Sequence, residues 1–258
     1  MIRKLTLTFT GVLTFLLLSA LTIAQDKPKD QLYMLHQDVI KVDMVDQYEA
    51  TVAKEVELWK KYNIDMEIRF ASQTDDNEYF YLTPIENMGG IDKMDAVWAK
   101  FMEDAGDAYT KVYGGYEGTY VYHRNMVWRR SAELSYVPEN KRITPEEVSF
   151  IHWDHYFIKE GKFDEAKEVM LKYKDLIASN NVADPYNVWF CELGGEIGWL
   201  VVTRSAENSV GFYTQATQHR EEMGDEFNKL WSEFSPLLKD FKHKNGMPRP
   251  EFTYKPAE

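Results

Sequence analysis

The sequence predicts an α+β fold in which one structural unit is used twice in tandem. Three observations support this fold class. Short matches between the two halves keep a nearly constant spacing, each half carries two amphipathic helical segments, and strand-like runs surround those segments in the same order. That order in each half is strand, helix, strand, strand, helix, strand.

The duplication rests on three pairs of matching segments that occur in the same order. Their offsets along the chain are 116, 121 and 118 residues, for Tyr33–Asp38 with Ser149–Asp154, Glu86-Asn87 with Glu207-Asn208, and Gly106–Tyr109 with Gly224–Phe227. Unrelated matches would scatter, so a nearly constant offset indicates a duplication with small loop insertions.

The elements follow in order from these matches. The matched Tyr33–Asp38 and Ser149–Asp154 are the first strands, and apolar residues at helical spacing then predict helices over Val45–Trp59 and Phe163–Ile177. Each helix is followed by two β-like runs joined by a short polar or Gly-Gly segment, which predicts a hairpin. The paired runs are Met66–Ala71 with Tyr79–Ile85, and Val188–Leu193 with Ile197–Thr203.

A second helix and a closing strand complete each copy. Apolar spacing predicts the helices over Met94–Val112 and Tyr213–Phe234. The closing strands are predicted at Thr119–Arg124 and Glu251–Tyr254. We therefore expect a first repeat over residues 25–130, a linker over 131–145 and a second repeat over 146–258, with mixed-charge residues 125–144 connecting the closing strand to the second copy.

The order βαββαβ is the ferredoxin-like plan, an antiparallel sheet with both helices on one face. The bare face needs cover, and the same face of the other copy supplies it. Two ferredoxin-like units packed sheet to sheet, here as a pseudo-dimeric α+β barrel in one chain, resemble the dimeric α+β barrel superfamily. That superfamily includes antibiotic-biosynthesis monooxygenases, NIPSNAP proteins and chlorite dismutases. The resemblance implies a substrate or cofactor cavity on the barrel side, and haem held by a histidine in the chlorite dismutase branch.

The N-terminus has the pattern of a secretory signal peptide over residues 1–24. Arg3 and Lys4 precede an uncharged run from Leu5 to Ile23, and the small residues Thr22 and Ala24 suit cleavage before Gln25. The alternative is a retained membrane anchor, since a run of this length just spans a bilayer. We expect an exported protein, periplasmic or secreted.

Net charge and cysteine content narrow the classes of partner. Removing Arg3 and Lys4 from the 30 basic residues leaves 28 against 42 acidic ones, a formal charge of −14. Such a chain is not expected to bind nucleic acid or, once the signal is removed, an anionic membrane.

Cys191 is the one cysteine, so no internal disulfide can form. One chain supplies both halves of the pseudo-dimer, and we expect a monomer.

The candidate site residues are His36, Asp38, His152 and Asp154, which repeat at the same place in the two first strands. Residues two apart share a strand face. We expect both pairs to face the barrel, with Leu35, Val39, Ile151, Trp153 and Phe157 packed against helices on the opposite face.

These pairs have three possible roles. A histidine beside an aspartate can act as a general base, it can be half of a metal site, or the two side chains can simply satisfy each other between packed sheets. His155 is turned away from His152 by strand alternation, so no set of metal ligands is assigned, and no cofactor can be named.

The sequence is compatible with three functions. The first is binding or transformation of a small molecule in the barrel cavity, with the His-Asp pairs as its polar groups. The second is a non-enzymatic interaction module of the cell envelope, and the third is haem binding, for which none of the six histidines can be matched to an axial ligand. No nucleophile-elbow, zinc-protease, Walker or Cys-x-x-Cys motif is present, so the sequence assigns no reaction.

Overall fold

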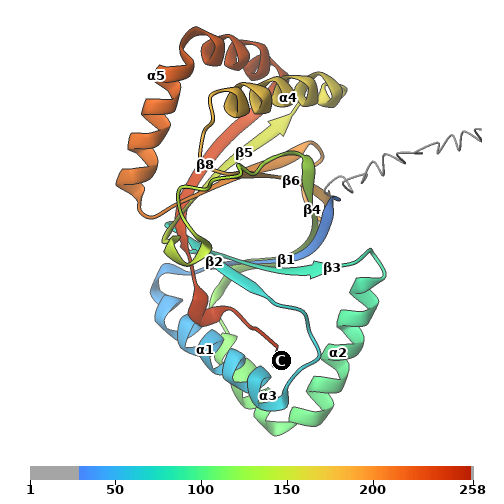
Figure 1. Ribbon diagram of the computed structural model, residues 1–258. Coiled ribbons are helices and arrows are strands. Elements are labelled where there is room, and N and C mark those ends of the chain that lie inside the picture. Colours follow the sequence, from blue (N-terminus) through green and yellow to red (C-terminus); the bar gives the residue numbers. More distant parts are fainter. Residues whose placement is uncertain (1–28, 257–258) are drawn as a thin grey trace, which may run out of the picture.

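The computed structural model describes residues 29–256 and shows a closed eight-stranded barrel with helices outside it (Figure 1). The expected signal peptide at residues 1–24 lies outside the described residues. Within residues 29–256, no helix combines the length and the apolar character needed to cross a bilayer.

Each half of the chain has the predicted element order. The first half comprises β1 (Gln31–Ile40), α1 (Val45–Tyr62), β2 (Phe70–Thr74), β3 (Glu78–Ile85), α2 (Gly90–Ala105), α3 (Asp107–Tyr113) and β4 (Tyr120–Tyr136). The second comprises β5 (Phe150–Ile158), α4 (Phe163–Ser179), β6 (Tyr186–Leu193), β7 (Trp199–Ala206), α5 (Ser209–Phe234) and β8 (Leu238–Pro248). The predicted α+β fold class is therefore confirmed.

The strands form two ferredoxin-like sheets that close on each other. The orders are β4-β1-β3-β2 and β8-β5-β7-β6, and every neighbouring pair is antiparallel. The seams β2–β8 and β4–β6 join the two sheets into one barrel. Closure pairs every edge strand of the two sheets, which removes the exposed edges that each sheet would have alone.

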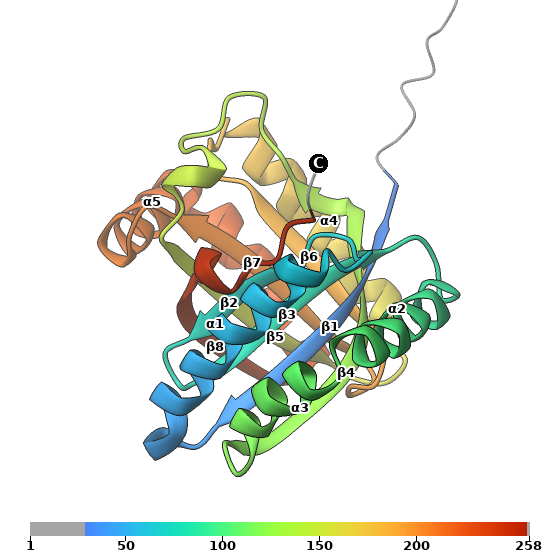
Figure 2. The ribbon, with the colours of Figure 1, turned by 90° about the horizontal axis from the view of Figure 1, so that it is seen from below.

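The helices cover the outer faces of the barrel. In Figures 1 and 2, α1, α2 and α3 lie against the sheet of the first repeat, and Figure 1 shows α4 and α5 on the opposite side, against the sheet of the second. Three large apolar cores result, one under each helix layer and one inside the barrel, and a small fourth cluster joins Phe212 of α5 to Phe150 and Ala206. The buried members of the barrel core come from both repeats: Leu35, Phe80, Met126, Trp128, Trp153, Phe157, Trp199 and Val201.

The expected assignment of the strand faces was wrong. Leu35, Trp153 and Phe157 point into the barrel, whereas the His-Asp pairs point outward under the helices. Alternation along a strand determines which residues share a face but not which face meets the helices. Trp128, Trp153 and Trp199 fill the interior of the barrel, which is packed by side chains from two opposing sheets.

Three of the predicted strand positions also need correction. The run Met66–Ala71 overlaps β2 only at Phe70 and Ala71, because β2 spans Phe70–Thr74. The first closing strand does not end at Arg124 but continues as β4 to Tyr136, so residues 125–136 are strand and not connector. The second closing strand is β8, and Glu251–Tyr254 instead form the end of a 3-10 turn and one isolated bridge between Tyr254 and Arg69. Most residues of β8 are polar and half-buried or exposed, so its hydrophobic pattern is weak.

A matched glycine bends the second helical segment of each repeat. Gly106 separates α2 from α3 with φ of +47°, and Gly224 kinks α5 with φ of +52°. Residues with a Cβ rarely adopt this region, which explains a glycine at both positions. These glycines belong to one of the matching segments from which the duplication was predicted.

Candidate functional site

The first strand of each repeat carries a His-x-Asp pair, and the last strand places a His-x-Asn pair beside it. In β1 and β4, Asp38 lies opposite His123 and His36 lies opposite Asn125. Antiparallel partners directly opposite each other have Cβ atoms about 5 Å apart, so the four side chains converge. They face outward, toward α1.

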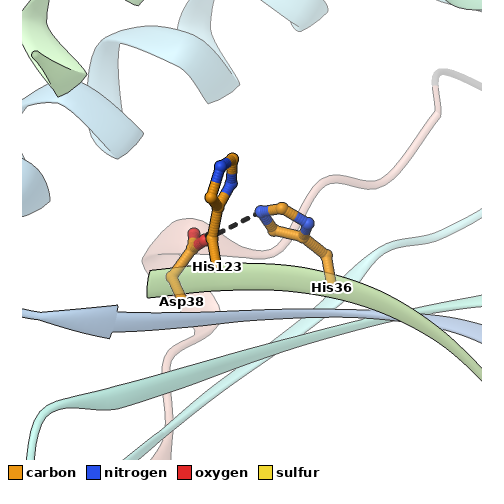
Figure 3. A group of neighbouring side chains, drawn as sticks. All are labelled: His36, Asp38 and His123. Atoms are coloured by element: carbon orange, nitrogen blue, oxygen red, sulfur yellow. Dashed lines mark ion pairs between the residues drawn. The ribbon is translucent and has the colours of Figure 1, made fainter. Parts of the chain in front are cut away.

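The first-repeat cluster is His36, Asp38 and His123 (Figure 3). His36 Nε2 lies 2.8 Å and His123 Nδ1 lies 4.0 Å from Asp38 Oδ1. The His36 contact lacks the direction of a hydrogen bond, so this buried oxygen accepts none from the residues that the structure describes. Asp38 Oδ2 does accept one, from the Tyr48 hydroxyl of α1 at 2.6 Å.

Neighbouring groups hold the two imidazoles of this cluster in place. Asn125 Oδ1 lies 2.7 Å from His36 Nδ1, and the His123 ring stacks on Tyr120 at a centroid distance of 4.6 Å. The side chain of Asp38 is 4% exposed, that of His36 is 26% exposed and that of His123 is 57% exposed. The cluster therefore has a buried carboxylate at its base and opens to solvent through its histidines.

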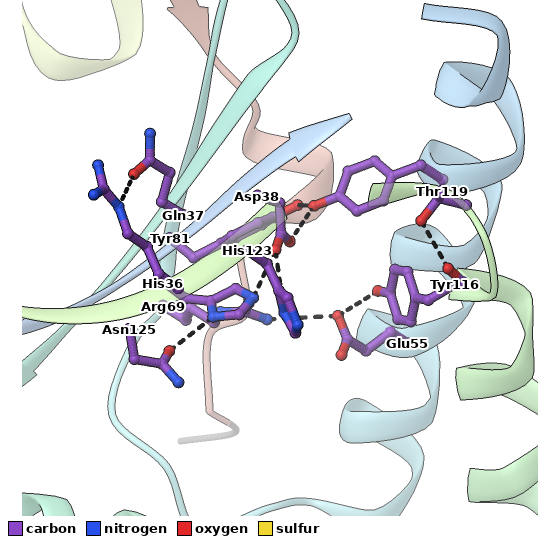
Figure 4. A network of polar contacts seen from close by, with 12 residues as sticks. His36, Gln37, Asp38, Glu55, Arg69, Tyr81, Tyr116, Thr119, His123 and Asn125 are labelled. Carbon is purple, nitrogen blue, oxygen red and sulfur yellow. Dashed lines mark hydrogen bonds and ion pairs between the residues drawn. The ribbon is translucent and has the colours of Figure 1, made fainter. Parts of the chain in front are cut away.

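Figure 4 shows a polar network behind the cluster, continuing from Tyr81 through Arg69 and Glu55 to Tyr116. The guanidinium of Arg69 stacks on the Tyr81 ring and lies 3.5 Å from Glu55 Oε2. Burial raises the pKa of Tyr81 and of Tyr48 well above 10. Both hydroxyls therefore stay protonated at neutral pH and keep donating within the network.

The second repeat places the same four residue types at the matched strand positions, but their contacts differ. Asp154 lies opposite His243 and His152 lies opposite Asn245, and His152 Nδ1 is 2.7 Å from Asn245 Oδ1. Here the contact between His152 Nε2 and Asp154 Oδ1, at 3.0 Å, is a hydrogen bond. His243 is exposed and stacks on His152.

One difference is an arginine at the position that a tyrosine occupies in the first repeat. Tyr81 of β3 lies opposite His36, whereas Arg204 of β7 lies opposite His152. Arg204 donates to Asp154 Oδ2 at 2.6 Å. Burial alone would raise the pKa of Asp154, but the hydrogen bond from His152 and the charge of Arg204 hold that pKa below its ordinary value.

A cavity lies between the second-repeat sheet and helices α4 and α5, outside the barrel. It measures about 370 Å³, against about 70 Å³ for the space between the aromatic side chains of the barrel core. Asp154, Tyr156 and Arg204 form part of its sheet wall. Its helix wall is mostly apolar, and its polar members are Tyr173 of α4 and His219, Arg220 and Asn228 of α5.

One tyrosine-to-valine difference between the repeats accounts for part of this cavity. Tyr79 lies opposite Asp38 and is fully buried, whereas Val202 lies opposite Asp154 and lines the cavity. A valine leaves empty the space that a phenol ring occupies in the first repeat. The two helix layers therefore share a plan but differ in this side chain, and the 370 Å³ cavity lies under the layer whose sheet carries the valine.

The four residues selected from the sequence form two separate pairs under opposite helix layers. Their partners on the last strands, His123 with Asn125 and His243 with Asn245, were not among the residues predicted from the sequence. A signal was present, since His-Arg-Asn at 123–125 and His-Lys-Asn at 243–245 repeat at an offset of 120 residues. Arg204 had no such signal, because its counterpart is a tyrosine. His155, as expected, points away from His152 and contacts Trp199 inside the barrel.

Comparisons with known proteins support the fold. No protein-family model matches the sequence, and no curated protein is a detectable relative. An anthrone oxidase-like protein superposes with a TM-score of 0.59 at 11% identity, over 91% of this chain and 95% of that one. A proposed monooxygenase from Lactobacillus acidophilus NCFM gives 0.52 at 7% identity, over 89% and 98%. A chlorite dismutase variant from Candidatus Nitrospira defluvii gives 0.51 at 10% identity, over 86% and 92%.

Proposed function

We propose that this chain, which has the dimeric α+β barrel fold within a single polypeptide, binds a small and mainly apolar organic molecule carrying one acidic group. The site is the cavity between the second-repeat sheet and helices α4 and α5. The observation that carries the proposal is the cavity itself, whose volume of about 370 Å³ lies in the range of sites for small ligands. The proposal extends to an exported protein, since residues 1–24 have the pattern of a signal peptide.

The polar groups of the cavity support an acidic group on the ligand. Asp154 is already paired with Arg204, and His219 lies 3.4 Å from Asp184. Arg220 also lines the cavity, and its guanidinium lies over the Phe227 ring at 5.3 Å without a salt bridge to any described residue. A guanidinium in such a position can bind a carboxylate or sulfonate through charge-assisted hydrogen bonds.

Two fluorescent probes test this proposal, anilinonaphthalene sulfonate as an apolar anion and N-phenylnaphthylamine as its neutral analogue. Val202→Tyr introduces the side chain found at Tyr79 of the first repeat, and we expect it to weaken both probes at least about tenfold by filling the cavity. Arg220→Gln should weaken only the sulfonate, by about tenfold, because it removes one charge-assisted contact. Fluorescence titration measures both affinities.

Lys229→Gln is the matched control, because it removes one charge from an exposed position of the same helix outside the cavity. It should leave both affinities at the wild-type value. The proposal is wrong if the wild-type chain binds neither probe at micromolar concentration, or if Val202→Tyr binds both probes as the wild type does.

Haem, which the resemblance implies for one branch of the superfamily, fits these residues poorly. His219 is the single imidazole among the cavity residues, and its Nε2 faces Asp184 Oδ2. One of the two cavity arginines, Arg204, is committed to Asp154. We therefore expect added haemin to keep its free absorption spectrum in the presence of the protein, and a shifted absorption band that is lost in His219→Ala would establish haem binding instead.

A further inference from the structure

We propose that the first repeat holds a divalent transition metal ion, such as Zn²⁺, between His36, Asp38 and His123. The three side chains each offer one ligand atom, and those atoms all lie within 4.8 Å of one another. Two imidazoles and one carboxylate are a donor set that suits zinc and related ions of the first transition series. This site is separate from the cavity of the proposed function.

The distances in the cluster match a shared ion. Zinc bonds of about 2.0–2.1 Å in tetrahedral geometry place neighbouring ligand atoms about 3.3 Å apart. The separations from Asp38 Oδ1 are 2.8 Å to His36 Nε2 and 4.0 Å to His123 Nδ1, on either side of that value. A small rotation of the exposed His123 side chain shortens the longer separation, and a small rotation of His36 lengthens the shorter one.

The orientation of His36 supports the same conclusion. Its Nδ1 lies 2.7 Å from Asn125 Oδ1, so Nδ1–H donates to the amide and a neutral ring has its lone pair on Nε2. That lone pair and the carboxylate oxygen of Asp38 then lie 2.8 Å apart, where two acceptors repel unless a cation lies between them. The contact between His36 Nε2 and Asp38 Oδ1 does not have the direction of a hydrogen bond. A metal ion bound to both atoms, but lying off the line that joins them, therefore accounts for this geometry better than a shared proton does. Histidines that bind a metal through one ring nitrogen usually donate a hydrogen bond from the other, as His36 does from Nδ1 to Asn125.

The balance of charge provides an independent observation. Asp38 is 4% exposed, and no lysine or arginine among the described residues forms a salt bridge with it. The nearby Arg69 is matched by Glu55. In the second repeat the equivalent carboxylate of Asp154 receives Arg204, which fills the position of Tyr81. A buried carboxylate needs a cationic partner. The guanidinium of Arg204 provides the positive charge for Asp154, and the metal ion provides it for Asp38.

The second repeat consequently retains the same residue types but not the site. Its imidazole and carboxylate are joined by a hydrogen bond, and the arginine already neutralises the carboxylate. His243 is exposed and stacks on His152, and the three side chains do not form a cluster of ligand atoms as their first-repeat counterparts do. The duplication thus offers a matched control for each proposed ligand.

The experiment is metal binding by the purified, tag-free chain after treatment with a chelator. Titration calorimetry with Zn²⁺ should give one ion per chain, and Co²⁺ should produce visible absorption bands from an N₂O donor set. His123→Ala and Asp38→Asn should each lower zinc affinity at least about tenfold. His243→Ala, at the matched position of the second repeat, should keep the wild-type affinity, and circular dichroism should be the same for all variants.

Asn125→Ala tests the positioning of His36 separately from ligation. It should lower zinc affinity about tenfold or more while leaving one ion bound per chain. Asn245→Ala, at the matched position of the second repeat, should leave the zinc affinity at the wild-type value. Two results would overturn the proposal: a wild-type chain that binds no Zn²⁺ at micromolar concentration, or a His243→Ala variant that loses as much affinity as His123→Ala. Binding of the fluorescent probes is measured on the same samples, so the failure of one proposal is distinguishable from the failure of the other.

Discussion

His155 shows how far a single side chain depends on the face of the strand that carries it. It follows Asp154 directly but points into the barrel, where Trp199 donates its indole N–H to Nδ1 at 3.2 Å. Its Nε2 is buried without a partner among the described residues. Burial and the charge of Lys244 lower the pKa of His155 to about 4, so the ring is neutral at physiological pH.

This shift makes stability depend on pH in a defined direction. The unfolded chain takes up a proton at an ordinary histidine pKa of about 6.5, whereas the folded chain resists it until about pH 4. The free energy of unfolding should therefore fall as pH drops from 6.5 to 4, with about 3 kcal/mol of that fall due to His155. His155→Gln keeps an acceptor for Trp199 and should show a shallower fall in urea unfolding between pH 7 and 4.5; an unchanged slope would contradict this.

At the scale of the elements, the seam between β2 and β8 depends on the absence of one side chain. Gly246 lies opposite Thr74 of β2 and Ile151 of β5. A Cβ at Gly246 would lie within 2.7 Å of Thr74 Cα and still closer to Gln73 O. The backbone of β8 can approach β2 only because residue 246 is glycine.

Gly246→Ala should therefore open this seam and lower the free energy of unfolding by about 2 kcal/mol or more, as overpacking against backbone does. Gly211→Ala in the first turn of α5 is the control, since the nearest atom to a new Cβ there is 3.5 Å away. That variant should be as stable as the wild type. Equal stability of the two variants in urea unfolding would show that the seam tolerates a side chain.

At the scale of the whole molecule, the two repeats are expected to unfold together. The barrel core takes side chains from both sheets, and the seams β2–β8 and β4–β6 join the repeats by backbone hydrogen bonds. A single repeat would expose both its half of this core and two strand edges. The repeats are thus copies in sequence but one cooperative unit in stability.

Trp153→Ala tests this cooperativity, because Trp153 belongs to the second repeat and packs against Phe80 of the first. Removing a buried indole should cost about 3–5 kcal/mol. Tryptophan fluorescence and far-ultraviolet circular dichroism should still give one coincident urea transition at lower midpoint. Two separated transitions would mean that the repeats fold independently.

Much of the fold was predictable from local patterns. The repeat offset, the helices beginning at Val45 and Phe163, and the hairpin that ends at Ile85 follow from periodicity and turn chemistry, which act over a few residues. The strand β8 was misplaced because its polar sequence is held by pairing with β5 and β2 on either side. Such pairing is non-local, and no hydrophobic alternation reports it.

The candidate sites were predictable only in part, for the same reason. The sequence by itself determined the duplication, the element order and the two His-Asp pairs, because each depends on spacing along one segment. The tertiary structure alone decided that these pairs lie under the helices and that His123 converges on one pair while Arg204 neutralises the other. Strand register depends on pairing between residues that lie from 42 (Phe157 and Trp199) to 99 (Gln31 and Arg130) positions apart. Which face of each sheet is buried inside the barrel is decided only when the two sheets close on each other.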